Sequence, residues 1–211
     1  MSVPKFYPII DTLAVSRRGT DPVTVADALL SAGGRIVQFR HKAHFDRNAF
    51  TAAAKISELC RDAGAQFVMN DRADIAMLLD ADLHIGQDDL PPPAARRLVG
   101  RERRLGLSTH NQNQLAAAES EPIDYVALGP IFGTVSKDNP DPIVGLFELA
   151  RLRSLTPKPV VAIGGVTRAN AVAAWNAGAD SVAVIGDLLP EDCSKDALRQ
   201  RAEEWIELSR T

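Results

Sequence analysis

The chain has few of the features that mark secreted proteins or membrane proteins. It contains only two cysteines among its 211 residues, Cys60 and Cys193, and they are too far apart to match a metal-ligand spacing. We therefore expect free thiols in a reducing compartment. No apolar run approaches the roughly 18 residues of a membrane span, and Met1 to Ile10 lacks the apolar stretch of a signal peptide. These absences predict a cytoplasmic protein with no membrane partner.

The chain also lacks an excess of charge of either sign. Lysine and arginine together number 24, aspartate and glutamate 27, and the net charge is −3. A nearly balanced charge gives no reason to expect a nucleic-acid partner. No linker, low-complexity tract or block of charge divides the sequence, and 45% of the residues are apolar. We therefore expect one globular domain over residues 1–211, large enough to bury a substantial core.

Short apolar segments recur along the chain, with helical patterns between them. The expected strand starts lie near Phe6, Arg35, Gln66, Asp82, Arg104, Asp124, Pro159 and Ser181. Their spacing averages about 25 residues, which suits one strand, one helix and two short loops per unit. Such alternation implies parallel strands joined by right-handed crossovers. Eight units predict a (β/α)8 TIM barrel of the α/β class, and a doubly wound open sheet is the alternative.

The second expected strand ends in long polar side chains. Gln38, Arg40 and Lys42 alternate along it, so they should share its inner face, while Val37 and Phe39 face the helices. All strands of a parallel barrel end on the face where such enzymes do chemistry. Two positive charges at that face suit an anion. Solvated charges at an exposed strand end are the alternative.

Acidic and amide side chains follow the third and fourth expected strands. Asn70 and Asp71 come after the third, and Asp89 comes after the fourth, with Asp88 as a competing acid. Carboxylate and amide oxygens suit Mg²⁺ that also keeps waters and substrate phosphates. Helix capping by Asp71 and by Asp89 is the alternative reading.

The histidines give a weaker signal. We expect a structural role for His84, which lies inside the fourth strand, and we expect His41 to face away from the barrel mouth. His110 could line the site or cap a helix, and both readings stay open. No arrangement of serine or cysteine with histidine and a carboxylate predicts nucleophilic catalysis.

Three later loops have the composition of phosphate sites. The loop after the sixth strand contains Thr134, Ser136 and Lys137, whose hydroxyls and ammonium can donate to phosphate. Gly164-Gly165 follows the seventh strand and Ile185-Gly186 follows the eighth, where barrels often bind phosphate on backbone N–H groups. An ordinary surface loop and tight turns are the alternatives. Together with the second strand, these loops predict two anion sites at one mouth.

Taken in order, these segments resemble the thiamine-phosphate synthase (thiamine-phosphate pyrophosphorylase) family over about residues 6–188. The matching segments are Gln38-Phe39-Arg40-His41-Lys42, Asn70-Asp71, His84-Ile85-Gly86-Gln87-Asp88-Asp89, Gly106-Leu107-Ser108-Thr109-His110, Gly129-Pro130-Ile131-Phe132, Lys137-Asp138, Ala162-Ile163-Gly164-Gly165 and Ala177-Gly178-Ala179-Asp180. The resemblance implies a (β/α)8 barrel with two small-molecule substrates. It would join 4-amino-2-methyl-5-(diphosphooxymethyl)pyrimidine to hydroxyethylthiazole phosphate, giving thiamine phosphate and diphosphate.

The resemblance also implies roles for individual residues. Asp71 and Asp89 would be ligands of a Mg²⁺ cofactor. The pyrimidine diphosphate would be surrounded by Gln38, Arg40, Lys42, Asn70, Ser108 and Lys137, of which Arg40, Lys42, Ser108 and Lys137 would act in catalysis. The thiazole phosphate would be bound by Thr134, Ser136, Gly165, Ile185 and Gly186. The implied mechanism is dissociative, so that the C–O bond to diphosphate breaks before the thiazole nitrogen attacks the pyrimidine-methyl cation.

Some positions depart from the family pattern, and two other functions remain as alternatives. Gly186 replaces a frequent serine, and Asp187 places a negative charge close to the expected phosphate loop. A thiazole tautomerase, which is an isomerase on the same barrel, is one alternative. A non-catalytic phosphate-binding paralogue is the other. Pro130 and Lys137, together with the two expected Mg²⁺ ligands, favour the synthase. The oligomeric state is not predicted.

Overall fold

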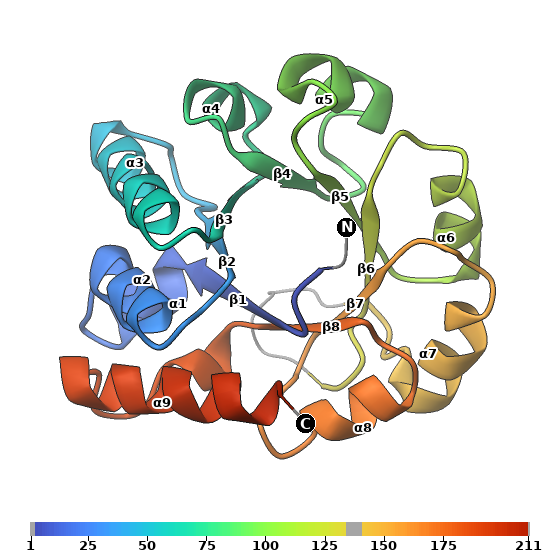
Figure 1. The fold of residues 1–211 in the computed structure, drawn as a ribbon. Coiled ribbons are helices and arrows are strands. Elements are labelled where there is room, and N and C mark those ends of the chain that lie inside the picture. Colours follow the sequence, from blue (N-terminus) through green and yellow to red (C-terminus); the bar gives the residue numbers. More distant parts are fainter. Residues whose placement is uncertain (1–2, 134–140, 211) are drawn as a thin grey trace.

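Eight parallel strands close into a barrel surrounded by helices in the computed structural model, which describes residues 3–133 and 141–210 (Figure 1). The strands are β1 (Phe6–Asp11), β2 (Ile36–Arg40), β3 (Gln66–Asn70), β4 (Asp82–Ile85), β5 (Leu105–Thr109), β6 (Tyr125–Leu128), β7 (Val160–Ile163) and β8 (Ser181–Val184). They follow one another around the barrel, and β8 pairs with β1 to close it. Each strand begins within one residue of its expected start. The (β/α)8 prediction is therefore confirmed, and the open sheet is excluded.

Helices follow the strands and cover the outside of the barrel. They are α1 (Thr12–Arg17), α2 (Pro22–Ser31), α3 (Arg47–Asp62), α4 (Ala73–Leu78), α5 (Pro92–Val99), α6 (Gln112–Ala118), α7 (Gly145–Arg153), α8 (Ala171–Asn176) and α9 (Lys195–Leu208), with a 3₁₀ turn η1 (Gly186–Leu188) after β8. Asp21 and Asp46 cap α2 and α3 by accepting backbone N–H bonds, as expected of acids at an N-cap. Among residues 3–133 and 141–210, none of the helices is both long enough and apolar enough to cross a membrane.

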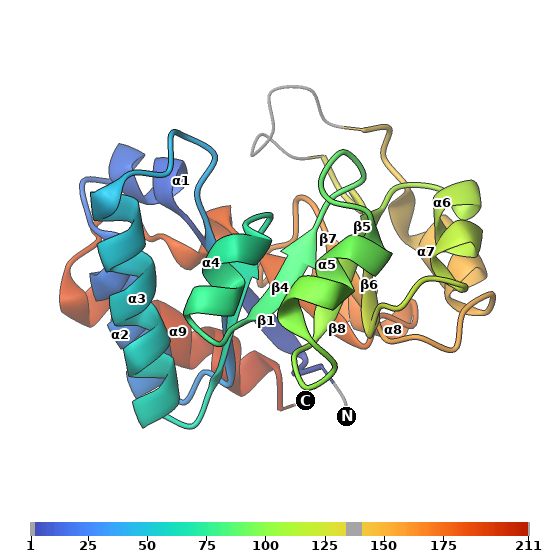
Figure 2. The same ribbon diagram turned by 90° about the horizontal axis from the view of Figure 1, so that it is seen from above.

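Two apolar layers result from the alternation of side chains along the strands. The outer layer packs strands against helices and includes Val37 and Phe39, as predicted. The inner layer fills the barrel and includes Tyr7, Ile36 and Tyr125. A side view places both chain termini near one end of the barrel (Figure 2). The loops that follow the strands lie at the other end, where the functional residues were expected.

Candidate active site

A cavity of about 860 Å³ opens at the end of the barrel where the strands finish. Its size is that of a small-molecule site. The expected site residues that line it are Gln38, Arg40, Lys42, Asn70, Asp71, Asp89, Ser108, Gly165, Ile185 and Gly186. They come from strand ends all around the barrel and meet at one opening. Three further expected residues, Thr134, Ser136 and Lys137, lie outside the described residues.

The polar face of β2 points into this cavity. The Gln38 side chain is buried, and its Nε2 donates to the Tyr7 hydroxyl at 2.9 Å. Arg40 pairs with Asp11 of β1, and its side chain is only 17% exposed, which rules out the reading of a solvated charge. Lys42 pairs with Asp71, which follows the neighbouring strand β3, but half of the Lys42 side chain stays exposed. Both cations are therefore held at the cavity by carboxylates, and the sequence did not reveal Asp11 as a partner.

Asp71 and Asp89 converge at the β3 and β4 corner of the mouth. Asp71 has a φ of 65°, a left-handed conformation that its backbone N–H stabilises by donating to the carbonyl of His84 at 2.8 Å. Asp89 Oδ2 accepts the N–H of Gly86 at 2.7 Å. The expected alternative of helix capping is wrong for both acids, because the N-cap residues of α4 and α5 are Arg72 and Pro91.

The electrostatics of this corner fit a divalent cation. Burial raises the pKa of Asp71, the Lys42 ammonium opposes that shift, and the adjacent Asp89 carboxylate adds to it. A carboxylate whose pKa is raised by burial and by a second carboxylate is stabilised in its charged form by a nearby cation. Within the described residues, no group of three or more acidic, histidine or cysteine side chains could enclose a metal. Asp71 and Asp89 could therefore hold Mg²⁺ only with additional oxygens from water or a phosphate ligand, as that ion prefers.

Ser108 contacts His84, which was expected to be structural but lies at the cavity. His84 lies inside β4 as expected, but its ring lines the cavity, and its Nε2 is 2.9 Å from Ser108 Oγ. Its Nδ1 is 3.1 Å from the hydroxyl of Tyr125, a buried residue of the inner layer to which no role was assigned from the sequence. Tyr125 and His84 occupy inward positions of their strands. The two-residue alternation along each strand could therefore have indicated from the sequence that both side chains point into the barrel.

The contacts of His41 and His110 show which way each of these side chains points. His41 points away from the mouth as expected, with Nδ1 2.8 Å from Thr12 Oγ1. His110 lines the cavity and donates from Nδ1 to the carbonyl of Gly129 at 2.6 Å. It does not cap α6, whose N-cap residue is Asn111.

The corner between β7 and β8 combines close backbone packing with open space. Gly165 has a φ of 64°, and a Cβ there would lie 2.3 Å from the carbonyl oxygen of Gly133, so only glycine fits. A Cβ at Gly186 would meet nothing within 4 Å. Arg18 and Arg201, which are not among the expected site residues, also line the cavity, and Arg201 donates to the carbonyl of Asp187 at this corner. The corner is therefore more positive than its motifs indicate.

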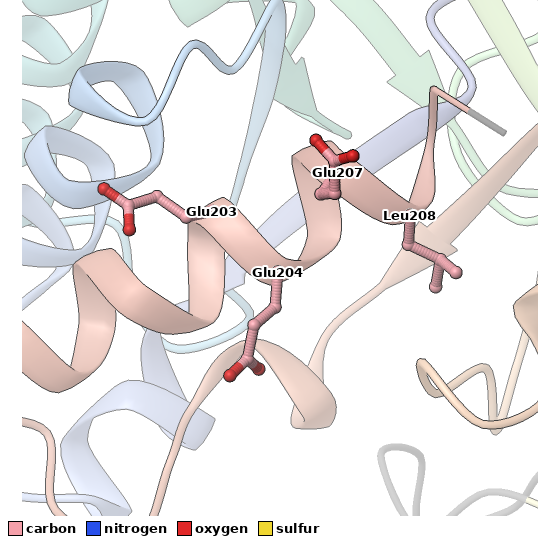
Figure 3. A pocket seen from close by; sticks show the side chains of 4 residues that line it. All are labelled: Glu203, Glu204, Glu207 and Leu208. Atoms are coloured by element: carbon pink, nitrogen blue, oxygen red, sulfur yellow. The ribbon is translucent and has the colours of Figure 1, made fainter.

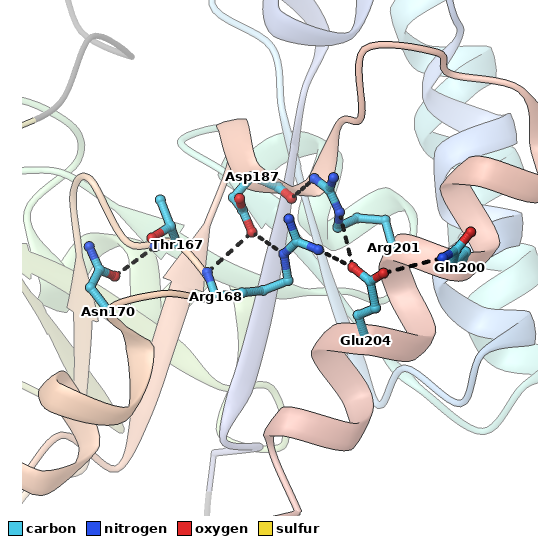
Figure 4. A network of polar contacts seen from close by, with 7 residues as sticks. All are labelled: Thr167, Arg168, Asn170, Asp187, Gln200, Arg201 and Glu204. Carbon is cyan, nitrogen blue, oxygen red and sulfur yellow. Dashed lines mark hydrogen bonds and ion pairs between the residues drawn. The ribbon is translucent and has the colours of Figure 1, made fainter.

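A network of charges balances Asp187 next to this corner (Figure 4). Its Oδ2 accepts bonds from the backbone N–H and Nε of Arg168, at 3.2 and 2.9 Å. Arg168 also pairs with Glu204 of α9, and Arg201 donates to the carbonyl of Asp187 at 2.8 Å. The carboxylate of Asp187, expected from the sequence to lie beside a phosphate-binding loop, is therefore paired with Arg168. The same contacts connect the loops after β7 and β8 to α9.

A second, shallow hollow lies on α9 and is lined by Glu203, Glu204, Glu207 and Leu208 (Figure 3). Its three carboxylates point in different directions. Each has its own arginine partner, namely Arg199, Arg168 and Arg210 respectively. The hollow therefore lacks the convergence seen at the barrel mouth, and the mouth is the candidate active site.

Comparisons with known proteins agree with this fold. A family described as "Thiamine monophosphate synthase" matches residues 6–188. A thiamine-phosphate synthase from Koribacter versatilis is 41% identical over 99% of this chain and 97% of its own. One from Chloroflexus aurantiacus is 39% identical over 87% of this chain and 85% of its own. The structure of a thiamine phosphate pyrophosphorylase from Pyrococcus furiosus superimposes with a TM-score of 0.83 and 27% identity, covering 98% of this chain and 96% of that one.

Proposed function

The chain belongs to the thiamine monophosphate synthase family, and from that membership we propose how its barrel mouth makes thiamine phosphate. The protein is an enzyme of thiamine biosynthesis. It is a transferase that condenses 4-amino-2-methyl-5-(diphosphooxymethyl)pyrimidine with hydroxyethylthiazole phosphate and releases diphosphate. In this proposal one domain, residues 1–211, carries the whole reaction. The observation that supports it most is the convergence of Arg40, Lys42, Asp71 and Asp89 at a single opening.

The pyrimidine diphosphate lies over β2 to β5 in this proposal. Diphosphate departs readily only when its negative charge is balanced. Arg40 and Lys42 reach it from the rim of β2, and Lys137 reaches it from the loop after β6. Asp71 and Asp89 would hold Mg²⁺, which would supply further charge balance for the leaving diphosphate. Asn70 and Ser108 complete the set of polar contacts, with Gln38 beside the pyrimidine ring.

Breaking the C–O bond first leaves a pyrimidine-methyl cation, which the thiazole nitrogen then attacks. That nitrogen has a free electron pair, so no general base is required on the nucleophile. His84, which lines the cavity, has Tyr125 and Ser108 at its two ring nitrogens, an arrangement suited to positioning. The task of the barrel is to align the two substrates and to exclude water, which would otherwise trap the cation.

The thiazole phosphate lies at the β7 and β8 corner in this proposal. The backbone N–H groups of Gly165, Ile185 and Gly186 donate to it, together with Thr134 and Ser136. The pairing of Asp187 with Arg168 and the presence of Arg201 support an anion site at this corner, because they offset the adjacent negative charge.

An assay with both substrates and Mg²⁺ tests the reaction. We expect stoichiometric release of diphosphate and formation of thiamine phosphate, which a coupled diphosphate assay and chromatography can follow. Absence of product at saturating substrates would favour a phosphate-binding paralogue. Interconversion of thiazole phosphate tautomers without condensation would identify the isomerase instead.

Substitution of Asp89 tests the metal site. Asp89→Asn keeps an oxygen that can accept the Gly86 N–H bond but removes the charge. We expect its activity to need a much higher Mg²⁺ concentration, and Asp88→Asn, at the exposed neighbouring acid, serves as the matched control. Identical Mg²⁺ titrations for Asp89→Asn and wild type would remove Asp89 from the metal site.

Substitution of Lys137 tests the charge balance of the leaving group. We expect Lys137→Ala to lower kcat by about 10²–10³-fold, as loss of one preorganised electrostatic group does in other enzymes. A kcat within twofold of wild type would contradict the proposed role.

A further inference from the structure

A continuous chain of hydrogen bonds crosses the interior of the barrel, and four of its five residues line the cavity. Gln38 Nε2 is 2.9 Å from the Tyr7 hydroxyl, which is 2.8 Å from the Tyr125 hydroxyl. The Tyr125 hydroxyl is 3.1 Å from His84 Nδ1, and His84 Nε2 is 2.9 Å from Ser108 Oγ. Gln38, both tyrosines and His84 are buried. The chain therefore joins two expected substrate residues, on β2 and β5, through three side chains to which the family resemblance gave no role.

The donors and acceptors in this chain favour one direction. The Gln38 amide nitrogen can only donate, so the Tyr7 oxygen accepts its bond. The Tyr7 hydrogen is then available to Tyr125, and the Tyr125 hydrogen is available to His84 Nδ1. With Nδ1 as acceptor, the neutral imidazole carries its hydrogen on Nε2 and donates it to Ser108 Oγ. Both phenol hydrogens and the imidazole hydrogen then have an acceptor, and the Ser108 hydroxyl hydrogen is the one left at the cavity end of the chain.

The opposite direction leaves one hydrogen without an acceptor in the chain. If Ser108 donated to His84 and Tyr125 donated to Tyr7, the Tyr7 oxygen would accept from both Tyr125 and Gln38. The Tyr7 hydrogen would then find no acceptor among these five groups, at a hydroxyl that is buried and costly to leave unpaired. Burial raises the pKa of both Tyr7 and Tyr125, so both phenols stay protonated and can serve as donors.

We propose that this chain is polarised from Gln38 to Ser108 and so turns the Ser108 hydroxyl hydrogen toward the substrate diphosphate. Because Ser108 Oγ accepts from His84, its own hydrogen points elsewhere, and the cavity that Ser108 lines is where an anion would accept it. At the other end, Gln38 uses its amide nitrogen within the chain and keeps its oxygen for a donor such as the pyrimidine amino group. Tyr7, Tyr125 and His84 are positioning residues in this proposal, which rests on the proposed function.

The tautomer of His84 provides a test that needs no substrate. ¹⁵N NMR of the imidazole nitrogens, assigned with a His84→Asn variant, should show hydrogen on Nε2 and a bare Nδ1 in the wild type. Tyr125→Phe removes the donor to Nδ1 and should change the tautomer ratio. A wild-type His84 with hydrogen on Nδ1 would overturn the proposed direction.

Kinetics test the consequence for the substrate. Tyr125→Phe should lower kcat/KM for the pyrimidine diphosphate by about tenfold, the effect of weakening one hydrogen bond to a charged group. It should leave KM for the thiazole phosphate within twofold of wild type. Thr109→Val is the matched control, because Thr109 is also a buried hydroxyl on β5 but bonds to the Ala127 carbonyl and does not line the cavity. If Tyr125→Phe behaves like Thr109→Val in both parameters, the positioning role is wrong.

Binding of inorganic diphosphate separates this proposal from the proposed function. Calorimetric titration with diphosphate and Mg²⁺ should give weaker binding for Tyr125→Phe than for wild type and Thr109→Val. A wild type that forms no thiamine phosphate would end the proposed function, yet the NMR spectrum and the diphosphate titration would still decide the direction of the chain. Equal diphosphate affinity for all three proteins would overturn the proposal even in an active enzyme.

Discussion

Gly106 of β5 is the position where one added methyl group should disturb the barrel interior most sharply. It lies opposite Tyr125 of β6 in the strand register. A Cβ at this position would lie 2.1 Å from Tyr125 Cζ and 2.5 Å from its hydroxyl oxygen. Carbon atoms in favourable contact are about 3.5–4.0 Å apart. In a Gly106→Ala variant the tyrosine ring must therefore move by more than its hydrogen bonds to Tyr7 and His84 can tolerate.

The expected loss of stability follows from this overlap. Forcing an extra methyl group into a packed core costs about 1–3 kcal/mol. For a chain of this length, each kcal/mol corresponds to roughly 2–4 °C in Tm, so we expect a fall of about 2–12 °C. Thermal unfolding followed by circular dichroism measures it. Gly186→Ala is the matched control, because its Cβ meets nothing within 4 Å, and its Tm should stay near that of the wild type.

A double-mutant cycle decides whether the Tyr125 ring is the cause. Tyr125→Ala alone should destabilise by about 3–5 kcal/mol through the cavity that it leaves. In the double variant the new methyl group at Gly106 meets no ring, so the combined loss should be smaller than the sum of the two single losses. Additive losses, within about 0.5 kcal/mol, would refute the steric reasoning.

Three further predictions concern the phosphate corner and the thiols. Gly186→Ser places a hydroxyl where there is free space, so KM for the thiazole phosphate should fall while Tm is unchanged, and a higher KM would contradict the proposed subsite. Arg168→Ala leaves the Asp187 carboxylate without its cation, so KM for the thiazole phosphate should rise. The rise should be smaller for Arg168→Lys, which keeps the positive charge. An unchanged KM in Arg168→Ala would show that the Asp187 charge does not affect thiazole phosphate binding. Burial raises the pKa of Cys60 from 9.0 to about 12, so a thiol reagent at mildly alkaline pH should modify partly exposed Cys193 first, and equal rates for both thiols would contradict that burial.

The linkage of Cys60 to stability has a definite sign. The pKa of Cys60 is higher in the folded state than in the unfolded state. Its contribution to the free energy of unfolding is therefore fully present at any pH below the unfolded-state pKa. That contribution declines as pH rises from the unfolded value of about 9 toward about 12, because only the unfolded thiol ionises there.

The amino-acid sequence alone was sufficient for the barrel, and it predicted ten of the residues that line the mouth. Strand starts could be predicted to within one residue because a parallel barrel repeats one pattern of apolar strand, amphipathic helix and short loops. The inward positions of Gln38, Arg40 and Lys42 followed from the two-residue alternation of a strand. The meeting of distant motifs at one opening followed from the rule that all strands of such a barrel end on the same side.

Only the tertiary structure decided which of these side chains are partners. The hydroxyls of Tyr7 and Tyr125 meet although the two residues are 118 positions apart in the sequence, and Arg40 pairs with Asp11, which is 29 positions away. Asp187 is neutralised by an arginine from the preceding loop and tied by another to the last helix. Such contacts depend on strand register, side-chain rotamers and the closure of β8 on β1, none of which a local pattern contains. Periodicity states which way a side chain points, whereas a hydrogen bond also requires that a particular atom from elsewhere in the chain be within about 3 Å of it.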